Sequence, residues 1–183
     1  MALQNSVLID NEHGIFSVIG LLTLKLEGPF EYWSREDIDD ELAKGAIFYA
    51  FDKDKVINGR LDVASICVAD VTDDPSEPDV SILEQADVPA LDAFLEKDVK
   101  SQLAEDGREV TQWMSSQLNQ PNNENGLVTA YITRDNGRER QIITLRIKVN
   151  GRKIVVMGDF DIAKKDALAG PIYSIMSNIR THD

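Results

Sequence analysis

The residues best suited to chemistry are two carboxylates near the end of the chain. The stretch "MGDFD" places Asp159 and Asp161 on alternate positions, so in a strand both side chains would lie on one face. Such residues hold a metal ion, or act in acid–base catalysis together with a further acid. An aspartate just before a helix also accepts the helix's free amide hydrogens. We expect this capping role for Asp161 and no metal site, and the sequence identifies no partner acid for Asp159.

A second acidic run is similar to half of a calcium loop but fails its spacing. An EF-hand needs oxygen ligands at its first, third and fifth positions and a glycine at its sixth. In "DKDKVINGRLD", which begins at Asp52, the fifth position is Val56 and the sixth is Ile57. We therefore expect a solvated turn around Asn58-Gly59 instead of a calcium site.

The rest of the sequence carries no catalytic signature. It contains no Gly-x-Ser-x-Gly, His-Glu-x-x-His, Walker A or dinucleotide fingerprint. His13 falls at an expected turn and His182 at the end of the chain. Cys67 is the sole cysteine and lies in the apolar run "DVASICVADV", which predicts a buried, inert thiol and excludes an internal disulfide. We predict a protein without enzymatic activity or cofactor.

Composition and charge restrict the possible partners. The 183 residues are 43% apolar and 28% charged, which is typical of a globular protein and predicts one domain over residues 1–183. The net charge of −13 argues against nucleic-acid binding, because phosphates would be repelled. The apolar stretch near the beginning has no basic region before it, and no stretch approaches the roughly 18 apolar residues that a membrane-spanning helix needs. We therefore expect a soluble, cytoplasmic protein.

The charged residues are segregated along the chain. Residues 62–98 are rich in acids, with Lys97 as their one basic residue, and residues 134–153 are mostly basic among their charged positions. Attraction within the molecule, together with solvated faces, would explain this pattern. A bipolar surface that binds a partner would explain it as well. The stretch "DDPSEPD" is expected to be an exposed, mobile loop because it combines prolines with acids.

The two tryptophans are the aromatic candidates for a partner site, since aromatic residues dominate interface energetics. We expect Trp113 in the core. Trp33 lies beside Pro29 and Phe30 in an expected loop and is the better interface candidate. The predicted partner-binding residues are Asp73, Asp74, Glu77, Asp79, Arg146, Lys148, Lys153 and Trp33.

Periodicity and turn signals predict the order of the elements. A β-rich region at 7–27 precedes a short helix at 34–45, and the strands "AIFYAF" and "RLDVASICVADV" follow. A helix is expected from Pro89 to Gly107, then the strand "EVTQWMSSQL", a three-stranded meander and a final helix. The first of these two helices has an apolar stripe expected to face the core: Leu91, Phe94, Leu95, Val99 and Leu103.

The meander allows its register to be predicted. Two-residue turns at Asn136-Gly137 and Asn150-Gly151 suit hairpins, because such turns need positive φ. Alternation then assigns one face to the core: Val128, Ala130, Ile132, Ile143, Leu145, Ile147, Val149, Ile154 and Val156. The other face carries basic residues among apolar ones: Arg140, Arg146, Lys148 and Lys153 with Tyr131, Ile142, Val155 and Met157. Lys148 would lie opposite Lys153, so either the protein's own acidic segment or a partner must cover them.

The order of the elements resembles the PsbP-like superfamily, and "RQIITLRIKVNGRKIVVMGDFD" and "IYSIMSNIR" are similar to its long hairpin and final helix. The resemblance covers residues 88–180 best and the first half by element order. It implies an α+β fold with helices packed on an antiparallel sheet. Members include a photosystem subunit, a Ran-binding protein, DcrB-type envelope lipoproteins and Eag-type chaperones of bacterial type VI secretion, all of which bind proteins. This chain lacks the DcrB-type lipoprotein signal and adds an acidic insertion near 70–87, so no binding residue is transferred.

Two functions from different classes follow. The first is a non-enzymatic, cytosolic protein-binding factor, such as a chaperone for a secreted effector or an immunity protein that neutralises a toxin. A chaperone should present an apolar groove, and an immunity protein an acidic patch that matches a basic toxin; the acidic loop favours the latter. The second is a small carboxylate-dependent enzyme with no recognisable motif. The resemblance, the charge and the missing catalytic motifs favour the first function, with another protein as the partner.

Overall fold

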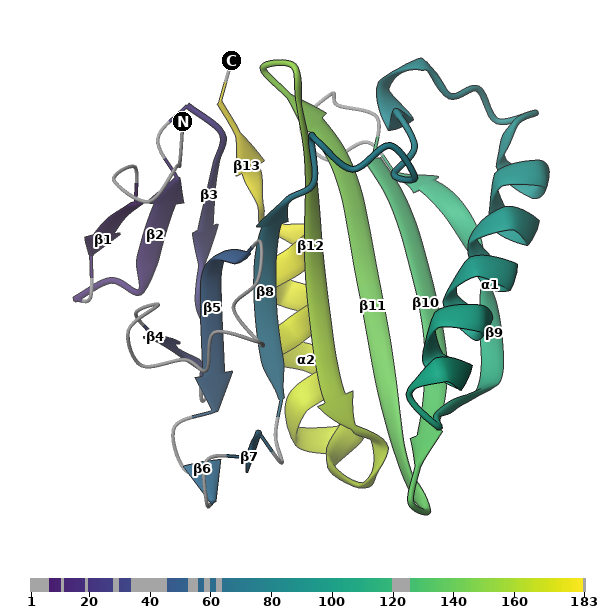
Figure 1. Ribbon diagram of the computed structural model, residues 1–183. Helices are drawn as coiled ribbons and strands as arrows, with labels where there is room; N and C mark the ends of the chain where they lie inside the picture. Colours follow the sequence, from purple (N-terminus) through teal and green to yellow (C-terminus); the bar gives the residue numbers. More distant parts are fainter. Residues whose placement is uncertain are drawn as a thin grey trace.

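A seven-stranded antiparallel sheet forms the centre of the computed structural model (Figure 1), in the order β4-β5-β8-β12-β11-β10-β9. The structure describes residues 7–10, 12–18, 20–27, 30–33, 46–52, 56–57, 60–61, 64–119 and 126–182. The strands of the large sheet are β4 Phe30–Trp33, β5 Ala46–Asp52, β8 Ser65–Asp70, β9 Glu109–Asn119, β10 Gly126–Asp135, β11 Arg138–Val149 and β12 Arg152–Asp161.

A smaller antiparallel sheet joins the two ends of the chain. Its strands, in the order β1-β2-β3-β13, are β1 Val7–Asp10, β2 Ile15–Val18, β3 Leu22–Lys25 and β13 Arg180–Thr181. The last strand pairs Arg180 with Thr23, which brings both termini to the same side of the molecule (Figure 1). A short hairpin of β6 Val56–Ile57 and β7 Arg60–Leu61 completes the strands.

In the described part of the chain, two helices cover opposite faces of the large sheet. Helix α1, Val88–Glu105, packs on the face that we call the front, and α2, Lys165–Ser177, packs on the back (Figure 1). Two 3₁₀ turns, η4 Val80–Ile82 and η6 Ile162–Lys164, precede them. The predicted α+β fold with helices on an antiparallel sheet is confirmed. The predicted helix at 34–45 and the turn at Asn58-Gly59 lie outside the described residues.

Both predicted hairpin turns are confirmed. Asn136 and Gly137 have φ of 50° and 80°, and Asn150 and Gly151 have φ of 49° and 77°. Positive φ at both central residues is the geometry whose twist matches that of paired strands. The resulting pairs, among them Lys148 with Lys153, are those that the sequence predicts.

The predicted core face of the meander is the back face. Six of its residues are buried in the main core: Ile143, Leu145, Ile147, Val149, Ile154 and Val156. Val128 and Ala130 are partly buried at the edge of this core. Side chains of α2 and of the small sheet close the core from the other side: Leu168, Ile172, Ile175, Met176, Phe16, Leu22 and Leu24. One continuous core therefore joins the two sheets.

Helix α1 packs on the front face by fewer apolar residues than its sequence predicts. Leu95 is buried and Leu91 and Val99 are half-buried, but Phe94 is 51% exposed. The predicted inward position of Phe94 is therefore wrong. Successive residues of a helix are about 100° apart, so when Leu95 faces the sheet its neighbour Phe94 is turned to the flank. A core contact of Phe94 would require rotation of the whole helix.

Two further expectations about strands differ from the structure. The run "RLDVASICVADV" forms two strands, β7 and β8, instead of one. Trp33 ends strand β4, where it pairs with Tyr49, and does not lie in a loop. The β-rich region at 7–27 and the strand "EVTQWMSSQL" are confirmed as β1 to β3 and β9.

We predict that Gly158→Ala destabilises the protein, because α2 lies directly on this glycine of β12. An added Cβ would meet Ile172 Cγ2 at 2.7 Å and Met176 Sδ at 3.2 Å. The free energy of unfolding, measured by chemical denaturation, should fall by about 1–3 kcal/mol, as in other overpacked cores.

Gly170→Ala is the matched control, since its Cβ would meet nothing within 4 Å. The helix preference for alanine opposes the restriction that the following Pro171 places on it, so the change should stay within about 1 kcal/mol. Equal stability of the two variants would contradict the close approach of α2 to Gly158.

Candidate functional site

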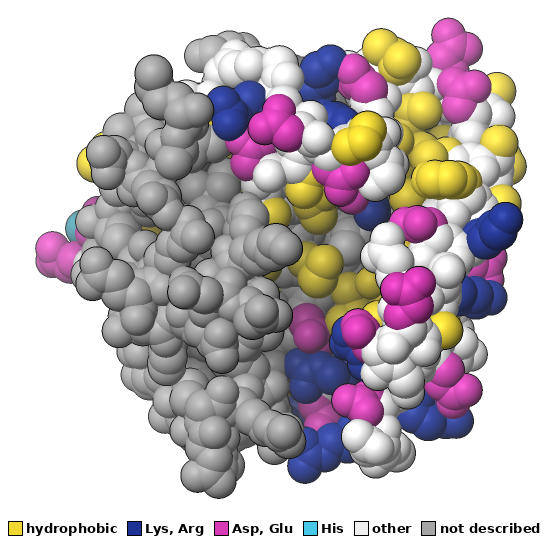
Figure 2. All heavy atoms as spheres, in the orientation of Figure 1, with side chains coloured by type: hydrophobic (Ala, Val, Ile, Leu, Met, Phe, Trp, Pro, Cys, Tyr) yellow, Lys and Arg dark blue, Asp and Glu magenta, His cyan; other side chains and the backbone are white. Residues whose placement is uncertain are grey.

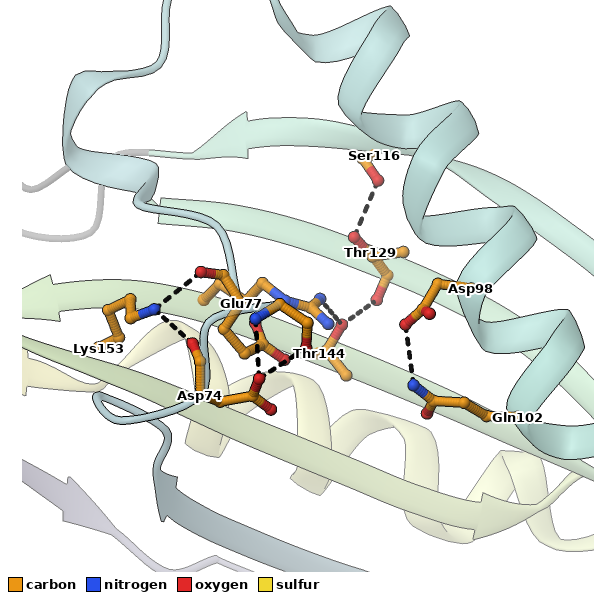
Figure 3. Close-up of polar contacts among 10 residues, drawn as sticks. Asp74, Glu77, Asp98, Gln102, Ser116, Thr129, Thr144 and Lys153 are labelled. Carbon is orange, nitrogen blue, oxygen red and sulfur yellow. Dashed lines mark hydrogen bonds and ion pairs between the residues drawn. The ribbon is translucent and has the colours of Figure 1, made fainter.

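The acidic segment, residues 70–87, crosses the front face over the basic end of the β11–β12 hairpin. Arg146 Nε donates to Glu77 Oε2 at 2.9 Å, and Lys148 pairs with Asp79. Lys153 Nζ donates to the backbone oxygens of Asp74 at 2.7 Å and Glu77 at 2.8 Å (Figure 3). The segregated charges of the sequence thus attract one another within the molecule. Of the two lysines opposite each other in the hairpin, Lys148 pairs with a carboxylate and Lys153 is held by backbone oxygens of the acidic segment.

The acids of this segment also shape its backbone. Asp70 accepts from the Thr72 amide at 3.0 Å, Asp74 from Ser76 at 2.8 Å, and Asp79 from Ser81 at 3.1 Å. In each turn an aspartate side chain bonds the backbone two residues on, a geometry that Asp-x-Ser/Thr sequences favour. These three repeats, "DVT", "DPS" and "DVS", are a signal in the sequence that predicts an ordered segment.

All three of these carboxyls have lowered pKa values, and for Asp74 the cause is its hydrogen bonds from Ser76. Hydrogen bonds from Lys148 and Ser81 lower the pKa of Asp79 to about 2. Burial acts to raise the pKa of Asp70, but hydrogen bonds from Thr72 and Arg152 outweigh it, so the pKa lies below its ordinary value. The three groups therefore stabilise the fold in their ionised form.

The predicted partner-binding residues of the acidic segment differ in their exposure. Asp73 and Asp74 are exposed, as predicted, but Glu77 and Asp79 are half-buried against the hairpin, so the expectation of a projecting loop is wrong for them. The reason is their pairing with Arg146 and Lys148, together with the contacts of Lys153 described above. Only the backbone of Trp33 is described, and a role of its side chain in partner binding stays a prediction.

The middle of the front face is a hollow with an apolar floor. The strand register places Tyr131 beside Ile142 and Ile142 beside Asp159, and in the next row Thr144 beside Met157 and Met157 beside Cys67. Tyr131 and Ile142 are nearly buried, but Met157 is 37% exposed. Figure 2 shows this face hollowed on the inner side of α1, with hydrophobic side chains at the bottom.

One flank of α1 forms the wall of this hollow. Asp92 Oδ1 accepts from Trp113 Nε1 at 3.0 Å and from the Ser116 amide at 2.6 Å, so this side of the helix faces β9. The opposite flank, with Phe94 and Asp98, therefore faces the middle of the sheet. Figure 3 shows Asp98 on the side of α1 toward Thr144. We call this surface the front groove: Leu91, Phe94 and Asp98 on α1, and Tyr131, Ile142, Thr144, Val155 and Met157 on the sheet.

A chain of hydroxyl groups connects the floor to the acidic segment. Ser116 Oγ lies 2.8 Å from Thr129 Oγ1. Thr144 Oγ1 donates to the backbone oxygen of Thr129 at 3.3 Å. Arg146 Nη1 then donates to Thr144 Oγ1 at 3.1 Å (Figure 3). These buried polar groups are satisfied by one another, which fixes the strands beneath the groove.

The two carboxylates of the stretch "MGDFD" have separate roles. Asp161 Oδ1 accepts from the Ala163 amide at 2.8 Å, so it caps the 3₁₀ turn η6 and not the final helix α2 as predicted, whose N-cap residue is Lys164. Asp159 lies next to Ile142, at the edge of the front groove, and accepts from Arg140 Nε at 2.7 Å. Burial raises the pKa of Asp159, although the Arg140 charge opposes this. Among the described residues, no group of three or more metal-ligating side chains is found.

Burial also affects Tyr131, Trp113 and Cys67 on this face. It raises the pKa of Tyr131 to about 12, and the ring of Tyr131 stacks on that of Trp113, with centroids 5.3 Å apart. Trp113 is therefore part of the packing under α1, as predicted. Cys67 is half-buried, not fully buried as expected. The sequence correctly assigns Met157 to the face of the meander opposite the core. It does not identify Phe94 and Asp98 as groove residues, because amphipathic patterns do not show where a helix stops covering a sheet.

A second concave region lies on the small sheet. It is a pocket of about 410 Å³ lined by Ile15, Thr23, Leu24, Lys25, Glu27, Asn178 and Arg180. Lys25 and Arg180 lie on adjacent strands beside Glu27, so the pocket mixes both signs of charge. It shares no residue with the front groove.

Two solved structures resemble the chain in fold. The cyanobacterial PsbP of Synechocystis sp. PCC 6803 matches with a TM-score of 0.58 at 11% identity, over 96% of this chain and 91% of that chain. LpqN of Mycobacterium tuberculosis, a protein involved in cell envelope biogenesis, matches with a TM-score of 0.51 at 9% identity, over 90% of this chain and 86% of that chain. These likenesses show a PsbP-like fold. No protein-family model matches the chain, and no curated protein matches it in sequence.

In the part of the chain that the structure describes, neither long helix is apolar enough over its length to cross a membrane.

We predict that Lys148→Glu lowers the free energy of unfolding by about 1–3 kcal/mol, because it replaces the ion pair with Asp79 by a repulsion at a half-buried position. The exchange Lys148→Glu with Asp79→Lys should recover part of this loss. Chemical denaturation of both variants gives the coupling energy. A Lys148→Glu variant as stable as the original protein would show that the pair contributes nothing.

The lowered pKa of Asp79 predicts a pH dependence with a defined sign. A depressed carboxyl pKa stabilises the fold above the unfolded value of 3.8, and this stabilisation is lost as the pH falls toward about 2. The original protein should exceed Asp79→Asn in unfolding free energy by up to about 1 kcal/mol at neutral pH, since the carboxylate is partly exposed. The difference should vanish near pH 2, and a difference constant with pH would contradict the assignment.

Proposed function

We propose that this protein is a non-enzymatic protein-binding factor that holds an apolar segment of a partner in the front groove. The observation that carries the proposal is the exposure of Phe94 and Met157 beside a floor of nearly buried apolar residues, Tyr131 and Ile142. Exposed apolar side chains that gather in one hollow are typical of a binding site. Single apolar residues scattered over a convex surface are common and would not indicate a binding site.

The geometry favours a chaperone over a toxin-neutralising immunity protein. An acidic patch that matches a basic toxin needs free carboxylates, and Glu77 and Asp79 are engaged by Arg146 and Lys148. An apolar groove is what a chaperone needs to shield a segment that would otherwise aggregate. A specific likeness to DcrB-type or Eag-type proteins, an effector of type VI secretion as the partner, and a cytoplasmic location belong to this proposal.

The test compares capture of the partner by the tagged, full-length protein and by two variants. Phe94→Glu places a charge at the groove wall and should abolish capture of the partner that the original protein retains in stoichiometric amount. The variant should still fold, because Phe94 is half exposed. Mass spectrometry identifies the partner, and circular dichroism confirms the fold.

Leu8→Glu is the matched control, since Leu8 is exposed on β1 of the small sheet, outside the groove. It should retain the partner. Loss of the partner in both variants, or in neither, would contradict the groove as the binding site.

A carboxylate-dependent enzyme is the second candidate, and one observation favours it: Asp159 has a raised pKa and lies at the edge of a hollow that substrate would reach. Asp161, the other carboxylate of "MGDFD", accepts from the Ala163 amide and caps η6. An activity that Asp159→Asn abolishes, in a protein that captures no partner, would support this candidate. An activity that survives the substitution would contradict it.

A further inference from the structure

Among the described residues, the cations that border the front groove are already paired. Each forms an ion pair with a nearby acid: Arg108 with Asp106 at 3.0 Å, Arg140 with Asp159 at 2.7 Å, Arg146 with Glu77 at 2.9 Å, and Lys148 with Asp79. These cations therefore contribute little net positive charge to the groove.

The acids on the wall of the groove have no such partners. Asp98 and Glu105 are seven residues apart, two helical turns, so both lie on the flank of α1 that faces the groove. Asp98 accepts from Gln102 Nε2 at 2.9 Å, and none of the ion pairs between described residues uses Asp98 or Glu105. Lys97 and Lys100 fall on the other side of the helix. Figure 2 shows acidic side chains along the inner edge of α1.

From this asymmetry we propose that the segment bound in the front groove is amphipathic and cationic, with apolar side chains on the floor and Lys or Arg side chains against Asp98 and Glu105. The inference rests on the proposed function and specifies its partner. Apolar contact with Met157 and Phe94 would supply most of the affinity, since burial of apolar surface does so in most associations. The acidic wall would supply selectivity and a faster association.

Charge also disfavours a second copy of this chain as the occupant. The net charge of −13 repels a second molecule as a whole. An acidic segment would meet like charges along the whole wall. A neutral apolar segment would leave Asp98 without a counter-ion while reducing its contact with water, which costs stability.

The test uses two synthetic peptides and needs no knowledge of the natural partner. One is an amphipathic helix of leucine and lysine, and the other has glutamine at every lysine position. Fluorescence anisotropy should show tighter binding of the lysine peptide to the full-length protein. The double variant Asp98→Asn with Glu105→Gln should weaken that binding about 3- to 30-fold and leave the glutamine peptide unaffected. The weakening should shrink in high salt, because salt screens exposed charges.

A matched double variant removes the same total charge elsewhere. Glu12→Gln with Asp166→Asn changes two exposed acids outside the groove, and it should leave the affinity for the lysine peptide within about 2-fold, since distant surface charges are screened. Equal weakening by both double variants would show attraction to net charge alone and would overturn the proposal. Equal binding of the two peptides, or no binding of either, would overturn it too.

The variant Phe94→Ala distinguishes the proposed cationic specificity from the proposed function on which it rests. If Phe94→Ala weakens both peptides but the variant at Asp98 and Glu105 changes neither, the groove binds apolar segments without regard to charge. The cationic specificity is then wrong, and the proposed function stands. If Phe94→Ala changes the binding of neither peptide, the groove is not the binding site, and both proposals fail.

Discussion

The two-residue turn at Asn150-Gly151 constrains most of the molecule, because its left-handed residues allow one register for β11 and β12. That register sends the branched apolar residues of both strands to the back, where α2 and the small sheet bury them. The same turn is tied to the small sheet, since Asn150 Nδ2 donates to the Gly20 oxygen at 2.7 Å and the His182 oxygen at 2.9 Å. A slip by one residue would put lysines into the core and break both contacts.

The same register also determines which charged side chains lie next to each other on the front face. Lys148 and Lys153 lie directly opposite each other, an arrangement that costs stability unless negative groups lie near. The acidic segment supplies them and is itself held by its aspartate turns, so it crosses the hairpin in a defined path. Because α1 begins where this segment ends, at Val88, the ion pairs also help to set where the helix lies. Charges that first suggest a partner surface therefore act in the assembly of the site beside them.

Local chemistry explains which parts of the fold the sequence predicts. Asn-Gly turns and strict alternation determine the meander down to single residue pairs, and the position of Asp161 before η6 determines its cap. The position of Phe94 depends on the rotation of α1 about its axis. A stripe of apolar residues does not show which of two adjacent members, Phe94 or Leu95, faces the sheet. The pairing of Glu77 with Arg146 joins residues 69 positions apart, and no local pattern encodes such a contact. The Asp-x-Ser/Thr repeats do encode the order of the acidic segment, and they are the signal that charge counting overlooks.

The existence of the groove follows from where α1 is anchored. Between Gln117 and Met114 the register of β9 against β10 slips by one residue, and the Ser116 amide in this bulge donates to Asp92 on the helix. A bulge frees a backbone donor that a sheet would otherwise use. The bond draws α1 over β9, the edge strand, which would otherwise offer its backbone to other chains. A helix held at the edge leaves the middle of the face uncovered. The exposure of Met157 in the groove thus follows from the way α1 is held at β9, by the two bonds of Asp92 and by the packing of Leu91 and Leu95.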